Sequence, residues 1–413
     1  MKVAPNAQKR ICAVASLNIL RGLDREQLWA LLGAIDSAGL WAAELWGADN
    51  FLAGSLTERT SIDPWEQLRA LREGIKNTRL RLTLRGQSLL GCGIYADDVA
   101  DYLVARAAEN GIGAIRVYDA LNDPRNIETV MRAAKKYDLD LEAAMVYTTG
   151  PAGSVAFYSG YASLLEGAGA DRVCILDPEQ NLDTKTLCEL TSAVGGAISI
   201  PLVIGAGQMQ CIPLRDILAN DHVAGCDIDL CGMPDPIGHE LLGDAWDEIK
   251  KALPLTNKSD SAEGRSYIPP EYIERARRDA GWPTMAAPLD KLIIERAAAL
   301  YRNEDDGVAP ELSAGYRALV SGLYGRLPMP PSPDVMSALG GNASMVLTRP
   351  ADLLEPELDT LRTEIAPYLE QAEDILTYAM AGDAAVAFFE HRKCERYGLD
   401  ELHSVPSRGV HII

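Results

Sequence analysis

Polar side chains that could do chemistry follow a series of short apolar runs in the first 250 residues. They stand where each run ends, and they are Glu44, Arg85 with Gln87, Asp119, Tyr147 with Thr149, and Asp177. Carboxylates can act as general acids or bases, and a guanidinium can hold a carboxylate through two parallel hydrogen bonds. The set therefore suggests a polar site with Arg85 as its main cation.

Each of these residues also has a structural interpretation, and the sequence leaves both open. Arg85 could anchor a ligand carboxylate, or it could form an ion pair with Asp119 or Asp177. Asp119 is typical of a residue that binds backbone groups and holds a loop. Asp177 could be a base or the start of an Asp-Pro turn, and Glu44 could hydrogen-bond inside the fold.

The histidines limit any metal or acid–base hypothesis. The chain has only five, His222, His239, His391, His403 and His411, and none forms an HxH or HExxH pair. The eight cysteines make no CxxC pair, so we expect neither a zinc site nor a disulfide framework.

Charge and hydropathy exclude other classes of protein. The net charge of −20 argues against nucleic-acid binding, which depends on cationic groups that neutralise phosphates. No apolar run is long enough to cross a membrane, and "MKVAPNAQKR" lacks a secretory apolar segment. We therefore expect a cytoplasmic protein that binds neither nucleic acid nor membrane.

The apolar runs that position these side chains alternate with amphipathic segments. Eight strands are expected, at Cys12–Leu17, Ala42–Leu45, Arg81–Leu84, Ala114–Tyr118, Glu142–Tyr147, Arg172–Leu176, Leu202–Ile204 and Cys226–Leu230. Segments such as "REQLWALLGAIDSAGL" have helical spacing of apolar residues. Eight strand–helix repeats favour an α/β fold of the (β/α)8 (TIM) barrel type, with a doubly wound sheet as the alternative. No GxGxxG follows the first strand, which argues against a dinucleotide-binding variant.

A change of composition predicts the domain organisation. Residues 1–252 are expected to form the barrel, the polar residues 253–268 a linker, and residues 269–413 a mainly helical C-terminal domain. In a barrel of this kind, the side chains at the C-terminal ends of the strands form the site.

At these strand ends the chain resembles the carboxyltransferase domain of biotin-dependent enzymes, such as pyruvate carboxylase, the oxaloacetate decarboxylase α subunit and the transcarboxylase large subunit. The resemblance extends over most of the chain. It rests on "AELWGADNF", "LRGQSLLG", "IRVYDALNDPRN", "VYTTGP" and, towards the C-terminus, "GLYGRLPMPPSPDV" and "TRPADLLEPELDTL". It implies a barrel followed by a helical extension and a tendency to dimerise.

The resemblance also implies where the family's metal ligands should be. In that family an Asp, a carbamylated Lys and two His hold a divalent cation that stabilises an enolate. These positions fall on Asn18, Leu176, Gly205 and Gly207, with the last placements uncertain by about a residue. A neutral amide is a poor ligand for such a cation, and leucine and glycine offer no side-chain ligand. We therefore expect no metal of the family type.

Part of the implied substrate site remains. Arg85, Gln87, Tyr147 and Thr149 are candidate substrate ligands, and Arg21 stands where the family has a substrate-binding Gln. No cofactor is expected, and no Met-Lys-Met occurs that could carry biotin on this chain.

Three functions remain open at this stage. The first is a non-catalytic partner or scaffold subunit, a homodimer or a heterodimer with an intact homologue. The second is a repurposed, metal-independent enzyme for a keto acid or related small carboxylate, with Asp177, Asp119 or Glu44 as acid–base groups. The third, and least favoured, is a biotin-dependent carboxyltransferase or decarboxylase with a displaced metal site.

Overall fold

The computed structural model describes most of the chain. The described residues are 11–14, 23–52, 55–56, 62–179, 181–205, 226–231, 244–252, 267–303, 310–340 and 345–397. Asn18, Arg21, Gly207 and nearly all of the expected linker lie outside them, so the predictions made for those positions stay predictions.

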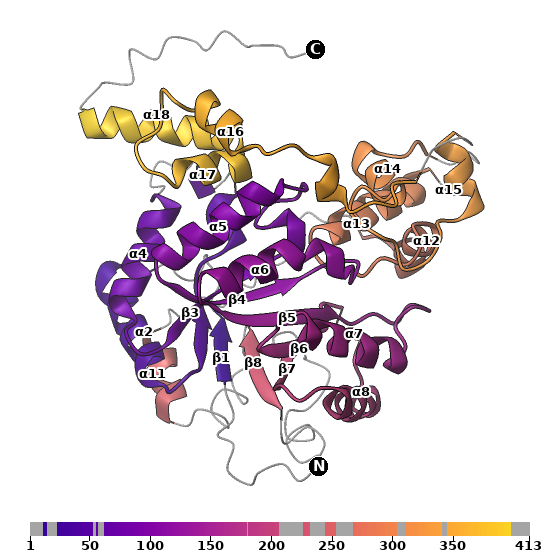
Figure 1. Cartoon of the computed structure of the whole chain (residues 1–413), viewed down its shortest axis with the longest axis horizontal. Coiled ribbons are helices and arrows are strands. Elements are labelled where there is room, and N and C mark those ends of the chain that lie inside the picture. Colours follow the sequence, from indigo (N-terminus) through magenta and orange to yellow (C-terminus); the bar gives the residue numbers. More distant parts are fainter. Residues whose placement is uncertain are drawn as a thin grey trace.

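Eight parallel strands form the centre of the molecule (Figure 1). Each pairs with the next, and β1 pairs with β8, so the sheet closes into a barrel. The strands are β1 (Ile11–Val14), β2 (Ala42–Glu44), β3 (Arg79–Leu84), β4 (Ile112–Tyr118), β5 (Asp140–Val146), β6 (Arg172–Leu176), β7 (Leu202–Gly205) and β8 (Asp227–Cys231). The α/β class and the parallel sheet are confirmed, and the open doubly wound alternative is wrong.

Three neighbouring strands begin earlier than their apolar runs indicate. β3, β4 and β5 each start two residues before the expected position, at Arg79, Ile112 and Asp140. The two polar residues form an ion pair, with Arg79 Nε 2.8 Å from a carboxylate oxygen of Asp140. This pair lets the strands extend beyond their apolar residues.

Helices follow the strands and cover the outside of the sheet. They are α2 (Arg25–Ser37), α4 (Pro64–Gly74), α5 (Asp97–Glu109), α6 (Glu128–Lys136), α7 (Val155–Gly167), α8 (Thr184–Ala197) and α11 (Asp244–Ala252). Side-chain caps fix several starts; for example, Asp24 and Gln27 form a capping box at α2. The helix expected after β7 would fall outside the described residues. Within the described part of the chain, no helix is long and apolar enough to cross a membrane.

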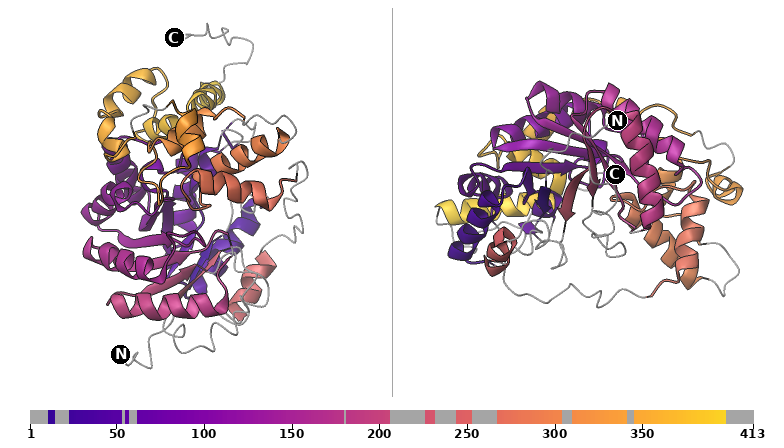
Figure 2. Two further views of the ribbon diagram at one scale, coloured as in Figure 1. Left: turned by 90° about the vertical axis from the view of Figure 1, so that its right-hand side faces the viewer. Right: turned by 90° about the horizontal axis from the view of Figure 1, so that it is seen from below.

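The C-terminal helices form two groups that contact different parts of the barrel (Figures 1 and 2). The first contains α12 (Pro270–Asp279), α13 (Leu289–Arg302), α14 (Ala314–Val320) and α15 (Pro333–Ala338). Its apolar core includes Ala120, Leu121 and Val146 from the ends of β4 and β5. The second contains α16 (Leu358–Glu364), α17 (Asp374–Ala381) and α18 (Asp383–Tyr397), and its core includes Leu56.

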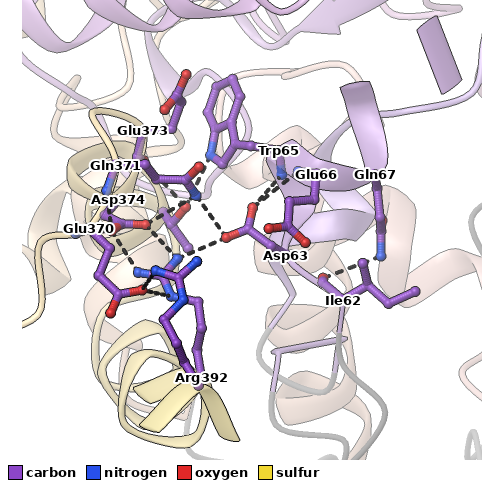
Figure 3. A network of polar contacts seen from close by, with 12 residues as sticks. Ile62, Asp63, Trp65, Glu66, Gln67, Glu370, Gln371, Glu373, Asp374 and Arg392 are labelled. Atoms are coloured by element: carbon purple, nitrogen blue, oxygen red, sulfur yellow. Dashed lines mark hydrogen bonds and ion pairs between the residues drawn. The ribbon is translucent and has the colours of Figure 1, made fainter. Parts of the chain in front are cut away.

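A buried ion-pair network attaches α17 and α18 to the barrel (Figure 3). Arg392 of α18 lies 2.9 Å from a carboxylate oxygen of Asp63, which caps α4, and 2.7 Å from one of Asp374. Its Nε lies 3.1 Å from Glu370. Burial raises the pKa of Asp63, although backbone donors and Arg392 oppose this. One guanidinium therefore compensates three carboxylates that have little access to water.

We expect Arg392→Met to destabilise the protein by about 3–5 kcal/mol, because it leaves buried carboxylates without their cation. The matched control is Arg396→Met, since Arg396 also contacts Glu370, at 2.9 Å, but has a side chain that is 55% exposed. Loss of this exposed pair should cost less than about 1 kcal/mol. Chemical denaturation measures the free energy of unfolding of both variants. Equal losses of stability would contradict the conclusion that Arg392 compensates the buried carboxylates.

Candidate functional site

Arg85 stands directly after β3 at the barrel mouth and is half-buried. Its guanidinium donates to the Gly91 carbonyl oxygen at 3.3 Å and hydrogen-bonds the Tyr118 side chain. Tyr118 in turn donates to the Ala287 carbonyl oxygen at 3.1 Å, and burial raises the pKa of Tyr118 to about 12. No carboxylate of the described residues forms an ion pair with Arg85, and its expected role as a ligand anchor stays a prediction.

Asp119 holds the loop that follows β4. One of its oxygens accepts hydrogen bonds from the backbone amides of Leu121 and Asp123, both at 2.9 Å, and the other accepts from Asn126 at 3.0 Å. Burial raises the pKa of Asp119 to about 7, although these donors oppose the shift. The contacts support the loop-holding interpretation, and an acid–base role for Asp119 stays a prediction.

The ends of β5 and β6 carry the remaining predicted residues. Asp177 is buried and accepts from the Leu182 amide at 2.8 Å, as expected for a residue that starts a turn. Burial raises the pKa of Tyr147, with the nearby Asp177 adding to the shift. Thr149 is exposed, while its neighbour Thr148 is buried. Asp177 and Tyr147 therefore lie close together, and their catalytic and binding roles stay predictions.

An arginine from the C-terminal helices reaches this part of the mouth. Arg277 of α12 is buried and donates to Thr148 and, at 3.0 Å, to Glu179. The second carboxylate oxygen of Glu179 is buried and has no hydrogen-bond partner among the described residues. Burial raises the pKa of Glu179, and the charge of Arg277 opposes the rise. The sequence offered no signal for Arg277, since "PEYIERARRD" is typical of a solvated helix.

The segment between α12 and α13 covers the ends of β4 and β5. Thr284 donates to the Ala120 carbonyl oxygen at 2.6 Å, close to the contact between Tyr118 and Ala287. Trp282 lies against Gly150, where an added Cβ would be only 3.2 Å from the indole ring. The C-terminal helices therefore form a wall of the mouth on the side of β4 to β6.

Glu44 lies inside the barrel among charged neighbours. Its Oε2 accepts from Arg81 Nε at 2.9 Å and from Thr83 at 2.7 Å. Arg81 also lies 3.7 Å from the fully buried Glu142, which pairs with Arg116. These contacts support the interior hydrogen-bonding interpretation of Glu44, and its acid–base role stays a prediction.

Gln87 belongs to a network that holds a C-terminal segment against α5. Its amide nitrogen donates to the Tyr95 carbonyl oxygen at 2.8 Å and to Asp97 at 3.0 Å, and its amide oxygen accepts from Arg349 at 2.9 Å. Arg349 also donates to Asp97 at 2.8 Å. The amide of Gln87 is therefore used within the protein, which supports a positioning role over the expected ligand contact.

Two of the four implied metal positions, Leu176 and Gly205, lie side by side at the ends of β6 and β7. A Cβ added at Gly205 would lie 2.9 Å from Leu176 Cδ2 and 3.0 Å from the Ile175 carbonyl oxygen. A larger residue at position 205 would therefore contact the Ile175 backbone and would require the end of the Leu176 side chain to move. Across the described residues, no group of three or more His, Cys, Asp or Glu could hold a metal ion. These residues do not fit the family's cation.

The barrel and the C-terminal helices define the class of the protein. Residues 270–409 match the model of the family described as "Conserved carboxylase domain". A pyruvate carboxylase subunit from Methanocaldococcus jannaschii is 28% identical over 421 residues, which cover 88% of this chain and 73% of the relative. The methylmalonyl-CoA carboxyltransferase 5S subunit of Propionibacterium freudenreichii subsp. shermanii is 27% identical, over 87% of this chain and 82% of the relative.

Solved structures share this fold. The carboxyl transferase domain of Rhizobium etli pyruvate carboxylase with 3-bromopyruvate superposes with a TM-score of 0.78 at 21% identity, over 95% of this chain and 78% of that one. At this identity the likeness shows the fold alone. The sequence matches and the shared fold agree: the chain is a homologue of the carboxyltransferase domain of biotin-dependent carboxylases.

The contact between positions 176 and 205 can be tested by a double-mutant cycle. Gly205→Ala should destabilise the protein by about 1–3 kcal/mol, because its Cβ overlaps Leu176. In a Leu176→Ala background the cost should fall by about 0.5 kcal/mol or more, measured by chemical denaturation. Gly195→Ala is the control, since no described atom lies within 4 Å of its added Cβ. Additive costs at positions 176 and 205 would mean that the two residues do not share this space.

The Asp97–Arg349 pair predicts a pH dependence of stability. Hydrogen bonds from Arg349 lower the pKa of Asp97 from 3.8 to about 2. A carboxyl with a lowered folded-state pKa stabilises the protein above its unfolded-state pKa, and this contribution is lost as the pH falls through the folded-state value. The stability advantage of wild type over Arg349→Gln should be largest above about pH 5 and should shrink as the pH falls towards 3.

Denaturation of both proteins across this pH range measures the difference. The control is Arg362→Gln, because Arg362 pairs at 3.1 Å with Asp359, whose side chain is 98% exposed. The free energy of unfolding of Arg362→Gln should stay close to that of wild type at every pH. If the stability advantage of wild type over Arg349→Gln grew as the pH fell, Arg349 would not be the cause of the lowered pKa of Asp97.

Proposed function

We propose that this homologue works without the family's metal centre, as a non-catalytic partner or scaffold subunit of a carboxyltransferase-type assembly. The observation that carries the proposal is the packing of Leu176 into the space beside Gly205. A histidine at position 205 would meet Leu176 at its first side-chain atom, and Leu176 offers no ligand of its own. The contact between Leu176 and Gly205 therefore supports a site without the family's Lys and His donors.

A site without the family's cation would lack the charge that stabilises the enolate. In the family, the cation supplies the electrostatic stabilisation of the enolate, which is the largest contribution to such reactions. Among the described residues, Arg85 and Arg277 are cationic side chains near the mouth, and Arg277 pairs with Glu179. The proposal therefore includes no carboxyl transfer by this chain alone and no cofactor bound to it.

Metal analysis of the natively purified protein tests this proposal first. We expect zinc, manganese and cobalt far below one ion per chain, because two implied ligand positions are apolar and cannot donate electrons to a cation. A homologue that keeps the histidine pair, purified in the same way, is the positive control. Near-stoichiometric metal in this chain would overturn the proposal and revive metal-assisted carboxyl transfer.

A second candidate function is a metal-independent enzyme for a keto acid or related small carboxylate. The observation that favours it is Arg85, whose guanidinium has no carboxylate partner among the described residues and hydrogen-bonds the partly buried Tyr118. A guanidinium beside a phenol hydroxyl can bind a carboxylate with charge-assisted hydrogen bonds. Asp177, Asp119 and Glu44 are the candidate acid–base groups, although each has a structural contact that explains it.

We expect Arg85→Ala to weaken binding of pyruvate or oxaloacetate about 10- to 100-fold in calorimetric titration, because the variant loses one charge-assisted pair. Arg132→Ala, at a surface position with a side chain that is 63% exposed, is the matched control and should bind like wild type. Unchanged affinity in Arg85→Ala would show that Arg85 is not the anchor. Turnover of the bound acid, followed by NMR, distinguishes an enzyme from a non-catalytic partner.

A further inference from the structure

Side-chain alternation along the strands determines which residues face the barrel mouth. Successive side chains of a strand point to opposite faces of the sheet. The residues just before Arg85, Tyr118 and Leu176 belong to the core beneath the outer helices, and they are Leu84, Val117 and Ile175. Arg85, Tyr118 and Leu176 therefore point to the inside of the barrel, and all three are partly exposed. A ligand in the mouth can contact all three.

Tyr118 and Leu176 share an apolar floor. Both pack against one cluster of buried side chains, which consists of Ala144, Cys174 and Val203. The strand pairing places Tyr118 level with this cluster and Leu176 one step nearer the opening. The side of the mouth formed by β5 to β7 therefore presents an apolar surface to a ligand.

The side of the mouth formed by β2 to β4 is polar. Glu44 accepts hydrogen bonds from Arg81 at 2.9 Å and from Thr83 at 2.7 Å. Arg85 stands at the next inward position, directly after β3. The mouth thus has a guanidinium on one side and an apolar surface on the other. A ligand that matches both sides has a negatively charged end and a hydrocarbon end.

We propose that the barrel mouth binds monocarboxylic acids with a short hydrocarbon chain, with the carboxylate at Arg85 and the chain against Leu176. The inference rests on the second candidate function, which supplies Arg85 as the anchor, and it adds the class of ligand and the residue that selects it. A methylene group gains free energy when it leaves water for an apolar surface, whereas a polar group there loses its hydrogen bonds to water. Buried side chains close the barrel below this level, so the chain of the ligand must be short.

Two carboxylates near Tyr118 restrict the ligand to a single negative charge. Burial is the main cause of the raised pKa of Tyr118, and the charges of Asp290 and Glu44 add to the rise. Both carboxylates therefore lie near the phenol that Arg85 contacts. One oxygen of Asp290 is buried and has no hydrogen-bond partner among the described residues. Asp290 and Glu44 would repel a second carboxylate on the ligand, but they would not repel a hydrocarbon chain.

The affinities of a series of small acids for the full chain, measured by NMR titration, test the proposal. Each methylene added from acetate to propionate to butyrate should raise the affinity about fourfold. Wild type should therefore bind butyrate about 10- to 20-fold more tightly than acetate. In malonate a second carboxylate replaces the methyl group of propionate, so malonate should bind at least about 10-fold more weakly than propionate.

Leu176→Asn separates the contact with the chain from the anchor. Asparagine is similar to leucine in size, but its amide would have to give up water to contact a hydrocarbon. This variant should bind acetate within about twofold of wild type, while its preference for butyrate over acetate should fall below about fourfold. Leu176→Met keeps an apolar side chain and should keep the preference. The matched control is Leu164→Asn, because Leu164 lies on the outside of α7 and is 47% exposed.

Affinities that do not depend on chain length would overturn the proposal, as would a preference for butyrate that Leu176→Asn leaves unchanged. Tighter binding of malonate than of propionate would also overturn it. Arg85→Ala tests the function on which the proposal rests, because loss of the anchor should weaken acetate and butyrate by the same factor. If Arg85→Ala weakens both acids but chain length has no effect, only the inference about Leu176 is wrong. If no monocarboxylate binds wild type, the anchor and the inference are both wrong.

Discussion

Charged side chains inside the barrel constrain the position of everything at its mouth. Arg81 and Arg116 lie between Glu44 and the fully buried Glu142, on four consecutive strands. A buried charge without its partner costs about 3–5 kcal/mol, so the register of β2 to β5 cannot slip without breaking these pairs. Arg85 follows β3 directly, and Tyr118 is the last residue of β4. Their side chains meet because the interior ion pairs hold these two strands in register.

The same chemistry attaches the C-terminal helices to the barrel. Arg277, Arg349 and Arg392 come from three separate segments, and each reaches carboxylate or amide oxygens of the barrel. Guanidinium groups suit this role because they donate several hydrogen bonds in a fixed plane and stay charged when buried. The C-terminal helices therefore lie in two groups, each placed by its own arginine contacts and its own apolar core.

The sequence predicted the strands better than the chemistry of the side chains that follow them. Apolar runs identify strands buried on both faces, and all eight were found, although the ion pair of Arg79 and Asp140 extends two of them. Among the described residues, Glu44, Arg85 and Asp177 lie at strand ends as expected, and their roles stay predictions. Their contacts could not be predicted, because Gln87 and Glu44 are held by Arg349 and Arg81, and no local pattern distinguishes those arginines from solvated ones.

The two sides of the barrel mouth differ in chemical character. At β6 and β7 an apolar side chain lies against a glycine, where an added Cβ would lie 2.9 Å from Leu176 Cδ2 and 3.0 Å from the Ile175 carbonyl oxygen. At β3 and β4 a half-buried guanidinium hydrogen-bonds a partly buried phenol, and no carboxylate of the described residues forms an ion pair with it. A partly buried charge without such a partner is costly, and an anionic ligand at Arg85 would offset that cost.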